Sequence, residues 1–147
     1  MSRLDQLSAQ QQVILKTSSV IGRRFLVAWL RGAFPTLASP EGLVSELTHL
    51  SELELTPLDT PDPELAYLFK HVVTQEVAYA SLPQTMRTRL HGALADWLEQ
   101  ADPDSSPLDL LAYHYDRSDN LPKRRSYLRR AGEAAAADYA NAAAGLR

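Results

Sequence analysis

The spacing of apolar residues predicts two helices at the start of the chain. Between residues 4 and 19 they recur at helical spacing, and Ser8 and Gln11 match a capping box near the start. Gly22 then acts as a stop signal. Residues 25–33 predict a short second helix that is nearly all apolar on one side.

A third helix is predicted from the sequence Ser39-Pro40-Glu41. Serine can cap a helix, proline fits the first helical position, and glutamate suits the positive end of the helix dipole. Four apolar residues give this helix its buried stripe: Leu43, Val44, Leu47 and Leu50.

The period then changes from helical to alternating. Residues 53–58 alternate apolar and polar side chains, which suits a half-buried strand. A turn cluster follows at residues 59–63, and residues 65–69 can return as the second strand of a hairpin. Three helices followed by a β-hairpin is the order of a winged-helix domain, which we assign to residues 1–82.

Two further helices connect this domain to the rest of the chain. Residues 70–81 are expected to form a helix with Val73, Val77 and Ala80 facing inward. After Pro83, residues 84–101 form the most regular amphipathic pattern of the sequence. Its apolar stripe consists of Met86, Leu90, Ala93, Leu94, Trp97 and Leu98. Residues 102–107 have the composition of a linker, so we treat 83–104 as a connecting helix with its linker.

The last part of the chain predicts a helical hairpin. Residues 108–117 and 121–138 form two helices around a turn, and Asn141 can cap a third helix that barely begins. The alanine-rich end favours helix but offers little side chain to bury, so it needs a neighbour. We therefore expect residues 105–147 to be a truncated first repeat of a larger helical array. The overall expectation is a mainly α protein.

Composition and charge narrow the functional classes. The 147 residues contain no cysteine, which excludes disulfides and zinc–thiolate sites and favours a cytoplasmic location. No apolar run reaches the length of a membrane span. The formal net charge is −3. Residues 32–69 carry seven acidic side chains and no lysine or arginine, whereas residues 117–130 carry six basic side chains and one acid. The two segments can complement each other or a partner.

No catalytic or metal-binding motif is present in the sequence. It lacks the glycine-rich loops that cradle phosphates. The four histidines lie about twenty residues apart in the chain, which is not the spacing of metal ligands on one helix. His114 stands between two tyrosines, a pattern that is usually core. We therefore predict no enzyme activity for this chain by itself, no catalytic residues, and no metal or cofactor of its own.

A series of short matches resembles one known arrangement. They are Phe69-Lys-His71, Gln75-Glu76, Tyr79-Ala-Ser-Leu82, Arg89-Leu-His91 and Trp97-Leu98, followed by Leu111-Ala-Tyr-His-Tyr115, Tyr127-Leu-Arg-Arg-Ala-Gly132 and Tyr139-Ala-Asn141. This series resembles the region after the ATPase core in bacterial signal-transduction ATPases of the STAND type. Some of those proteins are fused to class III adenylate or guanylate cyclases. The resemblance implies a winged helix followed by tetratricopeptide-like (TPR-like) repeats.

The resemblance also implies a candidate site at His71. Related ATPases carry a Met-His-Asp motif after the wing, whose histidine approaches the phosphates of bound ADP. Here the matching residues are Lys70-His71-Val72, so the histidine is present but the methionine and aspartate are not. The other interpretation of His71 is a histidine that packs or hydrogen-bonds at a helix start. ATP or ADP would be bound by a neighbouring domain and not by this chain.

Two functions remain open at this stage. The first is a non-catalytic regulatory module, with the neighbouring nucleotide-binding domain and further helical repeats as its protein partners. The parent protein would then be a signalling ATPase or a nucleotide cyclase. The alternative is a DNA-binding winged-helix domain of a transcription regulator. The acidic side chains of the third helix and wing oppose it, because they would repel phosphates.

Overall fold

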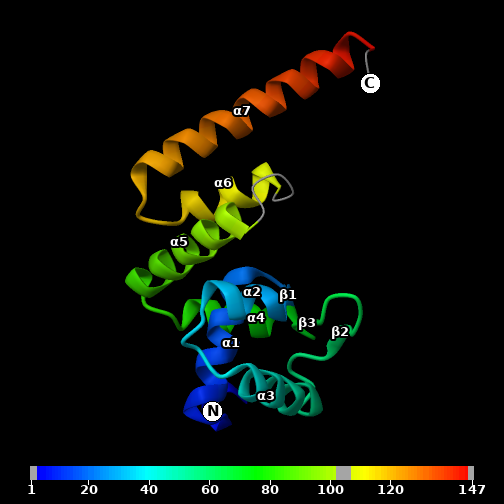
Figure 1. The fold of residues 1–147 in the computed structure, drawn as a ribbon, viewed down its shortest axis with the longest axis vertical. Coiled ribbons are helices and arrows are strands. Elements are labelled where there is room, and N and C mark those ends of the chain that lie inside the picture. The colour runs from blue at the N-terminus through cyan, green and yellow to red at the C-terminus, as the bar shows by residue number, and fades with distance from the viewer. Residues whose placement is uncertain (1–2, 102–106, 146–147) are drawn as a thin grey trace.

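The structure, a computed structural model, describes residues 3–101 and 107–145. It is mainly helical, with a small antiparallel sheet of three strands (Figure 1). Among the described residues, none of the helices combines the length and apolar character that crossing a membrane requires.

The first predicted helix is present, with its capping box. A turn of 3₁₀ helix at Arg3–Gln6 precedes α1, Ala9–Ile21. The backbone N–H of Gln11 donates to Ser8 Oγ at 3.1 Å, and the N–H of Ser8 donates to Gln11 Oε1 at 3.1 Å. These bonds satisfy two backbone groups that a helix start leaves without partners. Gly22 ends the helix with a positive φ of 149°, which glycine adopts more readily than other residues.

The predicted second helix is too long, because its first residues form a strand. Strand β1, Arg24–Leu26, precedes α2, Val27–Ala33. In the sheet, β1 pairs with β3, Ala66–Leu68, and Phe25 lies opposite Tyr67. A run of two or three apolar residues suits a strand or a helix equally well. Pairing with a segment about forty residues away decided between them, and that information is absent from the local pattern.

Helix α3, Pro40–Glu52, starts as the sequence predicts. It ends in a motif that the sequence pattern does not predict. Ser39 Oγ accepts the Gly42 N–H at 3.0 Å. At the other end Glu54 adopts a left-handed φ of 61°, while the Leu55 N–H donates to the Leu50 carbonyl. This is the Schellman arrangement, in which glycine is usual. This turn places the Leu55 side chain in the core.

The first strand of the predicted hairpin lies further along the chain than expected. Residues 53–57 are irregular, and β2 is Leu58–Thr60. The sheet order is β1-β3-β2, so β3 is central. The second predicted strand, residues 65–69, is confirmed at its centre. The shift of β2 follows from the left-handed turn at Glu54, which uses the preceding residues to end α3.

Helix α4, Val72–Ala80, has a burial pattern opposite to the one predicted. Ala78 is its buried residue, whereas Val73 is 66% exposed and Val77 is 43% exposed. Ala80 is exposed as well. The apolar spacing correctly indicated a helix, but the face that contacts α1 is a different one.

Helix α5, Gln84–Ala101, matches the prediction in both bounds and packs on two sides. It contacts α1 and α2 on one side and α6 on the other. Leu94 and Leu98 are buried as expected, while Met86 is 38% exposed. His91 and Ala95, which lie outside the predicted stripe, are buried too.

The C-terminal hairpin consists of α6, Leu108–Asp116, and α7, Leu121–Ala143. Asn120 caps α7, but Asn141 lies inside it and starts no new helix. Residues 102–106 of the predicted linker are outside the described part of the chain. Figure 1 shows the C-terminal half of α7 extending past α6. Residues 132–145 are all exposed.

Candidate functional site

Two histidines from different helices meet in the interior. His91 on α5 is 1% exposed and His114 on α6 is 0% exposed. Their Nδ1 atoms lie 2.8 Å apart, so one of the two nitrogens carries the shared hydrogen. The Nε2 atom of His91 is 2.7 Å from the Tyr79 hydroxyl of α4. A chain of hydrogen bonds therefore crosses from α4 through α5 to α6.

Burial keeps both imidazoles neutral near pH 7. Loss of hydration lowers the pKa of His91 to about 4, and the nearby positive charges of Arg117 and Arg87 act in the same direction. Burial likewise lowers the pKa of His114 to about 3, with His91 and Arg117 contributing. A neutral imidazole has one donor and one acceptor nitrogen. The shared hydrogen can therefore be bonded to Nδ1 of His91 or to Nδ1 of His114.

The chain of hydrogen bonds ends at His114 Nε2. This atom is buried and forms no hydrogen bond with any described residue. In one tautomeric arrangement this atom is a donor. In the other it is an acceptor, and the Tyr79 hydroxyl then accepts from His91.

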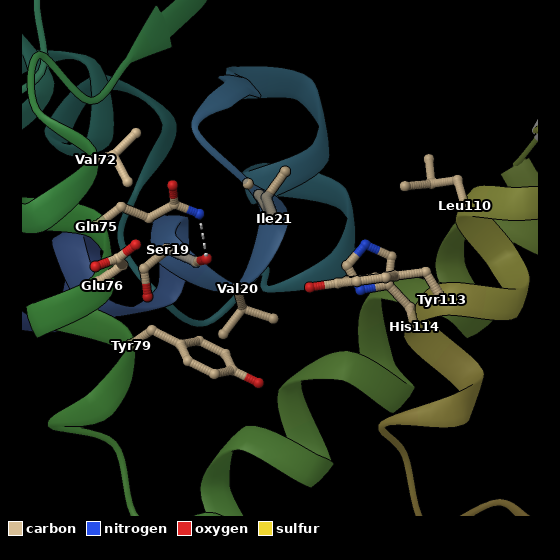
Figure 2. A pocket seen from close by; sticks show the side chains of 11 residues that line it. Ser19, Val20, Ile21, Val72, Gln75, Glu76, Tyr79, Leu110, Tyr113 and His114 are labelled. Atoms are coloured by element: carbon tan, nitrogen blue, oxygen red, sulfur yellow. Dashed lines mark hydrogen bonds between the residues drawn. The ribbon is translucent and has the colours of Figure 1, made fainter.

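A cavity of about 450 Å³ lies beside His114. Three segments line it: the C-terminal end of α1, one face of α4, and α6. Figure 2 shows Val20 and Ile21 of α1 between the α4 residues on one side and Tyr113 with His114 on the other. The Gln75 amide donates to the Ser19 carbonyl at 3.3 Å and so fixes the α1–α4 side of the cavity.

Two buried tyrosines hold the hairpin on α5. The Tyr115 hydroxyl donates to Asp96 Oδ1 at 2.8 Å, and burial together with this bond raises the pKa of Tyr115. The Tyr127 hydroxyl donates to Glu99, which also accepts from Lys123 at 2.8 Å. Burial alone would raise the pKa of Glu99, but these two donors lower it. The first bond joins α6 to α5, and the bonds to Glu99 join α7 to α5.

The residue singled out from the sequence lies elsewhere. His71 is exposed, directly precedes α4, and makes no capping hydrogen bond with its side chain. Its neighbour Lys70 forms an ion pair with Glu54 at 3.2 Å. The structure does not bring His71 to the histidine pair.

The sequence does not predict the pairing of His91 with His114. The four histidines are about twenty residues apart, so no two of them share a helix at ligand spacing. His114 is indeed a core residue, as the flanking tyrosines indicated. No signal in the sequence pairs it with His91, because the contact depends on how α6 packs on α5. Among the described residues, no three histidine or carboxylate side chains form a cluster that could hold a metal.

Comparison with known proteins gives no relative. No family model, no curated protein and no solved structure matches this chain.

Proposed function

We propose that this chain is a non-catalytic regulatory module that couples a nucleotide-binding domain to further helical repeats. Two features of the fold support this proposal. The order α1-β1-α2-α3-β2-β3, with β3 central, is compatible with a winged helix. Under this proposal the hairpin of α6 and α7, in which α6 packs on α5, is the first TPR-like repeat. The parent protein would be a STAND-type ATPase or a nucleotide cyclase of the kind that the short matches resemble.

The observation that carries the proposal is a pair of uncovered helix faces. Val73 and Val77 are one turn apart on α4 and are 66% and 43% exposed. On α7, Leu128 is 49% exposed and Tyr139 is 78% exposed. Apolar residues at helical spacing normally face a neighbour. We assign the α4 face to the nucleotide-binding domain and the α7 face to the next repeat.

His71 fits this assignment by position. It directly precedes the helix that carries Val73 and Val77 and is exposed itself. A domain that covers the α4 face would also approach His71. Under this proposal the imidazole is the group of this chain that would face the phosphates of ADP bound in the partner. The phosphates themselves would be held by the partner.

Binding of an environment-sensitive dye tests the uncovered α4 face. We expect 8-anilinonaphthalene-1-sulfonate to fluoresce with the folded chain, and the signal to fall clearly in the double variant Val73→Gln, Val77→Gln. Both side chains are exposed, so circular dichroism should remain unchanged. Leu58→Gln, at a site that is 47% exposed but lies on β2, is the matched control. Equal dye binding by the double variant and the wild type would refute the assignment of this face.

The DNA-binding alternative rests on the same order of elements, and the exposed face of α3 opposes it. Helix three of a winged helix commonly enters the major groove. Here that helix exposes Glu41 and Glu52 and has no lysine or arginine. These carboxylates would repel phosphates.

We expect no binding of a labelled mixed-sequence duplex in fluorescence anisotropy at low salt, where electrostatic attraction is strongest. Tight binding that weakens with added salt would favour the DNA-binding function instead. The basic residues of α7 would then be the first to mutate, starting with Arg124→Gln and Arg129→Gln.

A further inference from the structure

The groove between α1 and the start of α5 is lined mostly by apolar side chains and has a volume of about 540 Å³. Residues 33–37, at the end of α2 and just after it, form its third wall. Phe34 and Leu82 are buried, whereas Val13 and Met86 are exposed apolar residues at its border. A groove of this size with an apolar lining is typical of a small-molecule site.

Both charged residues that line the groove are basic. They are Lys16 of α1, which is half-buried, and Arg89 of α5, which is exposed. Lys16 is the single charged residue of α1, and residues 34–39 carry no charged side chain. Neither basic side chain forms an ion pair with another described residue. The described chain therefore supplies no counterion for these two charges.

The other charged side chains of α2 and α5 are bonded elsewhere. Their hydrogen bonds join Arg31 to the Pro40 carbonyl, Arg87 to the Leu82 carbonyl, Asp96 to Tyr115, and Glu99 to Lys123. The two acids of α5 thus bond to α6 and α7, and neither of them lines the groove. The groove keeps a positive charge as a result.

This combination selects an apolar ligand with a negatively charged group. Arginine and lysine form charge-assisted hydrogen bonds with a carboxylate, and the planar guanidinium can bind both carboxylate oxygens at once. An ammonium group in the same place would be repelled. Apart from Phe34, the apolar lining is aliphatic, and the flexible Met86 side chain can adapt to a ligand. A flexible aliphatic chain suits such a wall.

We propose that this groove binds an aliphatic carboxylate of the fatty-acid type, with its chain against the apolar residues between α1 and α5 and its carboxylate beside Lys16 and Arg89. The ligand would contact α1, the connection after α2, and α5, and would stabilise the packing of these elements. The inference goes beyond the proposed regulatory function and does not depend on the identity of the partner domain.

Nuclear magnetic resonance titration with octanoate at pH 7 tests the site directly. The chain has two methionines, so the Met86 methyl signal is readily identified. We expect saturable shifts of the Met86 and Val13 methyl signals, and no shift at Val73 and Val77 on α4. Hexanoate should bind about tenfold more weakly, because it buries two methylene groups fewer.

Ligands of equal chain length and different charge test the role of the two basic residues. Octan-1-ol lacks the charge and should bind about tenfold more weakly than octanoate. Octylammonium should bind more weakly than the alcohol, since its charge is repelled.

Matched variants separate this site from general attraction of an anion. The double variant Lys16→Gln, Arg89→Gln should weaken octanoate binding about tenfold and leave the binding of octan-1-ol unchanged. Circular dichroism should show an unchanged fold. The control Arg125→Gln, Arg129→Gln removes the same charge from the exposed surface of α7 and should have no effect on either ligand.

Three results would overturn the proposal. They are an absence of saturable shifts at Met86, equal affinity for octanoate and octylammonium, and an equal loss of octanoate affinity in the two double variants. The methyl signals of Val73 and Val77 report separately on the uncovered face of α4.

Discussion

Lowering the pH from about 7 to about 5 is expected to reduce the free energy of unfolding by about 4 kcal/mol, because two buried histidines must stay neutral. The pKa of an exposed histidine is 6.5, whereas burial lowers that of His91 to about 4 and that of His114 to about 3. Between these values the unfolded chain binds two protons that the folded chain does not. Protons therefore favour unfolding throughout this range.

The direction of the effect follows from proton linkage. A group whose pKa is lower in the folded state contributes full stability above its unfolded pKa and loses it as the pH falls toward its folded pKa. For one histidine the slope is about 1.4 kcal/mol per pH unit, so the pair gives about twice that slope below pH 6.5. Above about pH 5 most carboxylates remain ionised in both states, which leaves the histidines as the main contribution.

Urea denaturation at a series of pH values measures this slope. The double variant His91→Leu, His114→Leu removes both titrating groups, and its stability should change little between pH 7 and about pH 5. The hydroxyl of Tyr79, a half-buried residue, loses its partner in that variant. An unchanged slope in the leucine double variant would show that other groups cause the pH dependence.

Gly32→Ala is expected to destabilise the protein by about 2 kcal/mol, even though alanine is the better helix former. Gly32 lies in α2, and a Cβ atom there would come within 2.1 Å of Trp97 Cε2 on α5. That is far inside van der Waals contact, so the indole or the helix must move. Trp97 packs against the core, and its displacement would disturb the contact between α2 and α5.

Making Gly32→Ala in a variant that lacks the indole tests whether the clash with Trp97 causes the loss of stability. In the variant Trp97→Leu the indole is absent, so adding Gly32→Ala should be neutral or should stabilise by up to about 1 kcal/mol through helix propensity. Gly132→Ala is the control on α7, because nothing lies within 4 Å of its Cβ position. It should stabilise by a similar amount. Thermal unfolding measures all five proteins, the wild type included, and an equal cost of Gly32→Ala in both backgrounds would contradict the steric explanation.

Local signals in the sequence identified the helices well because caps act through neighbouring residues. The capping box at Ser8 and Gln11 and the Ser39 cap of α3 were both predicted and are both present. Helix α5 matches in both bounds. Each of these features depends on residues within one or two turns, so a single segment contains the information.

Features that depend on distant segments were predicted poorly. The local pattern predicts a helix where strand β1 forms, because the pairing partner β3 is about forty residues away. The inward face of α4 was assigned to Val73 and Val77, yet the helix packs on α1 through another face. The pattern of apolar residues shows that a helix has a preferred face but not whether this chain supplies the neighbour.

The sequence alone determined the mainly helical class, most helix starts, the absence of cysteine chemistry, and the acidic character of α3. Tertiary structure decided the three-stranded sheet, the uncovered faces of α4 and α7, and the meeting of His91 with His114 beside a cavity. The physical reason is the distance along the chain between the residues that interact. Caps and helical periods arise from bonds within a few residues, whereas a buried histidine pair arises from the packing of α6 on α5 and is set by the energy of the whole core.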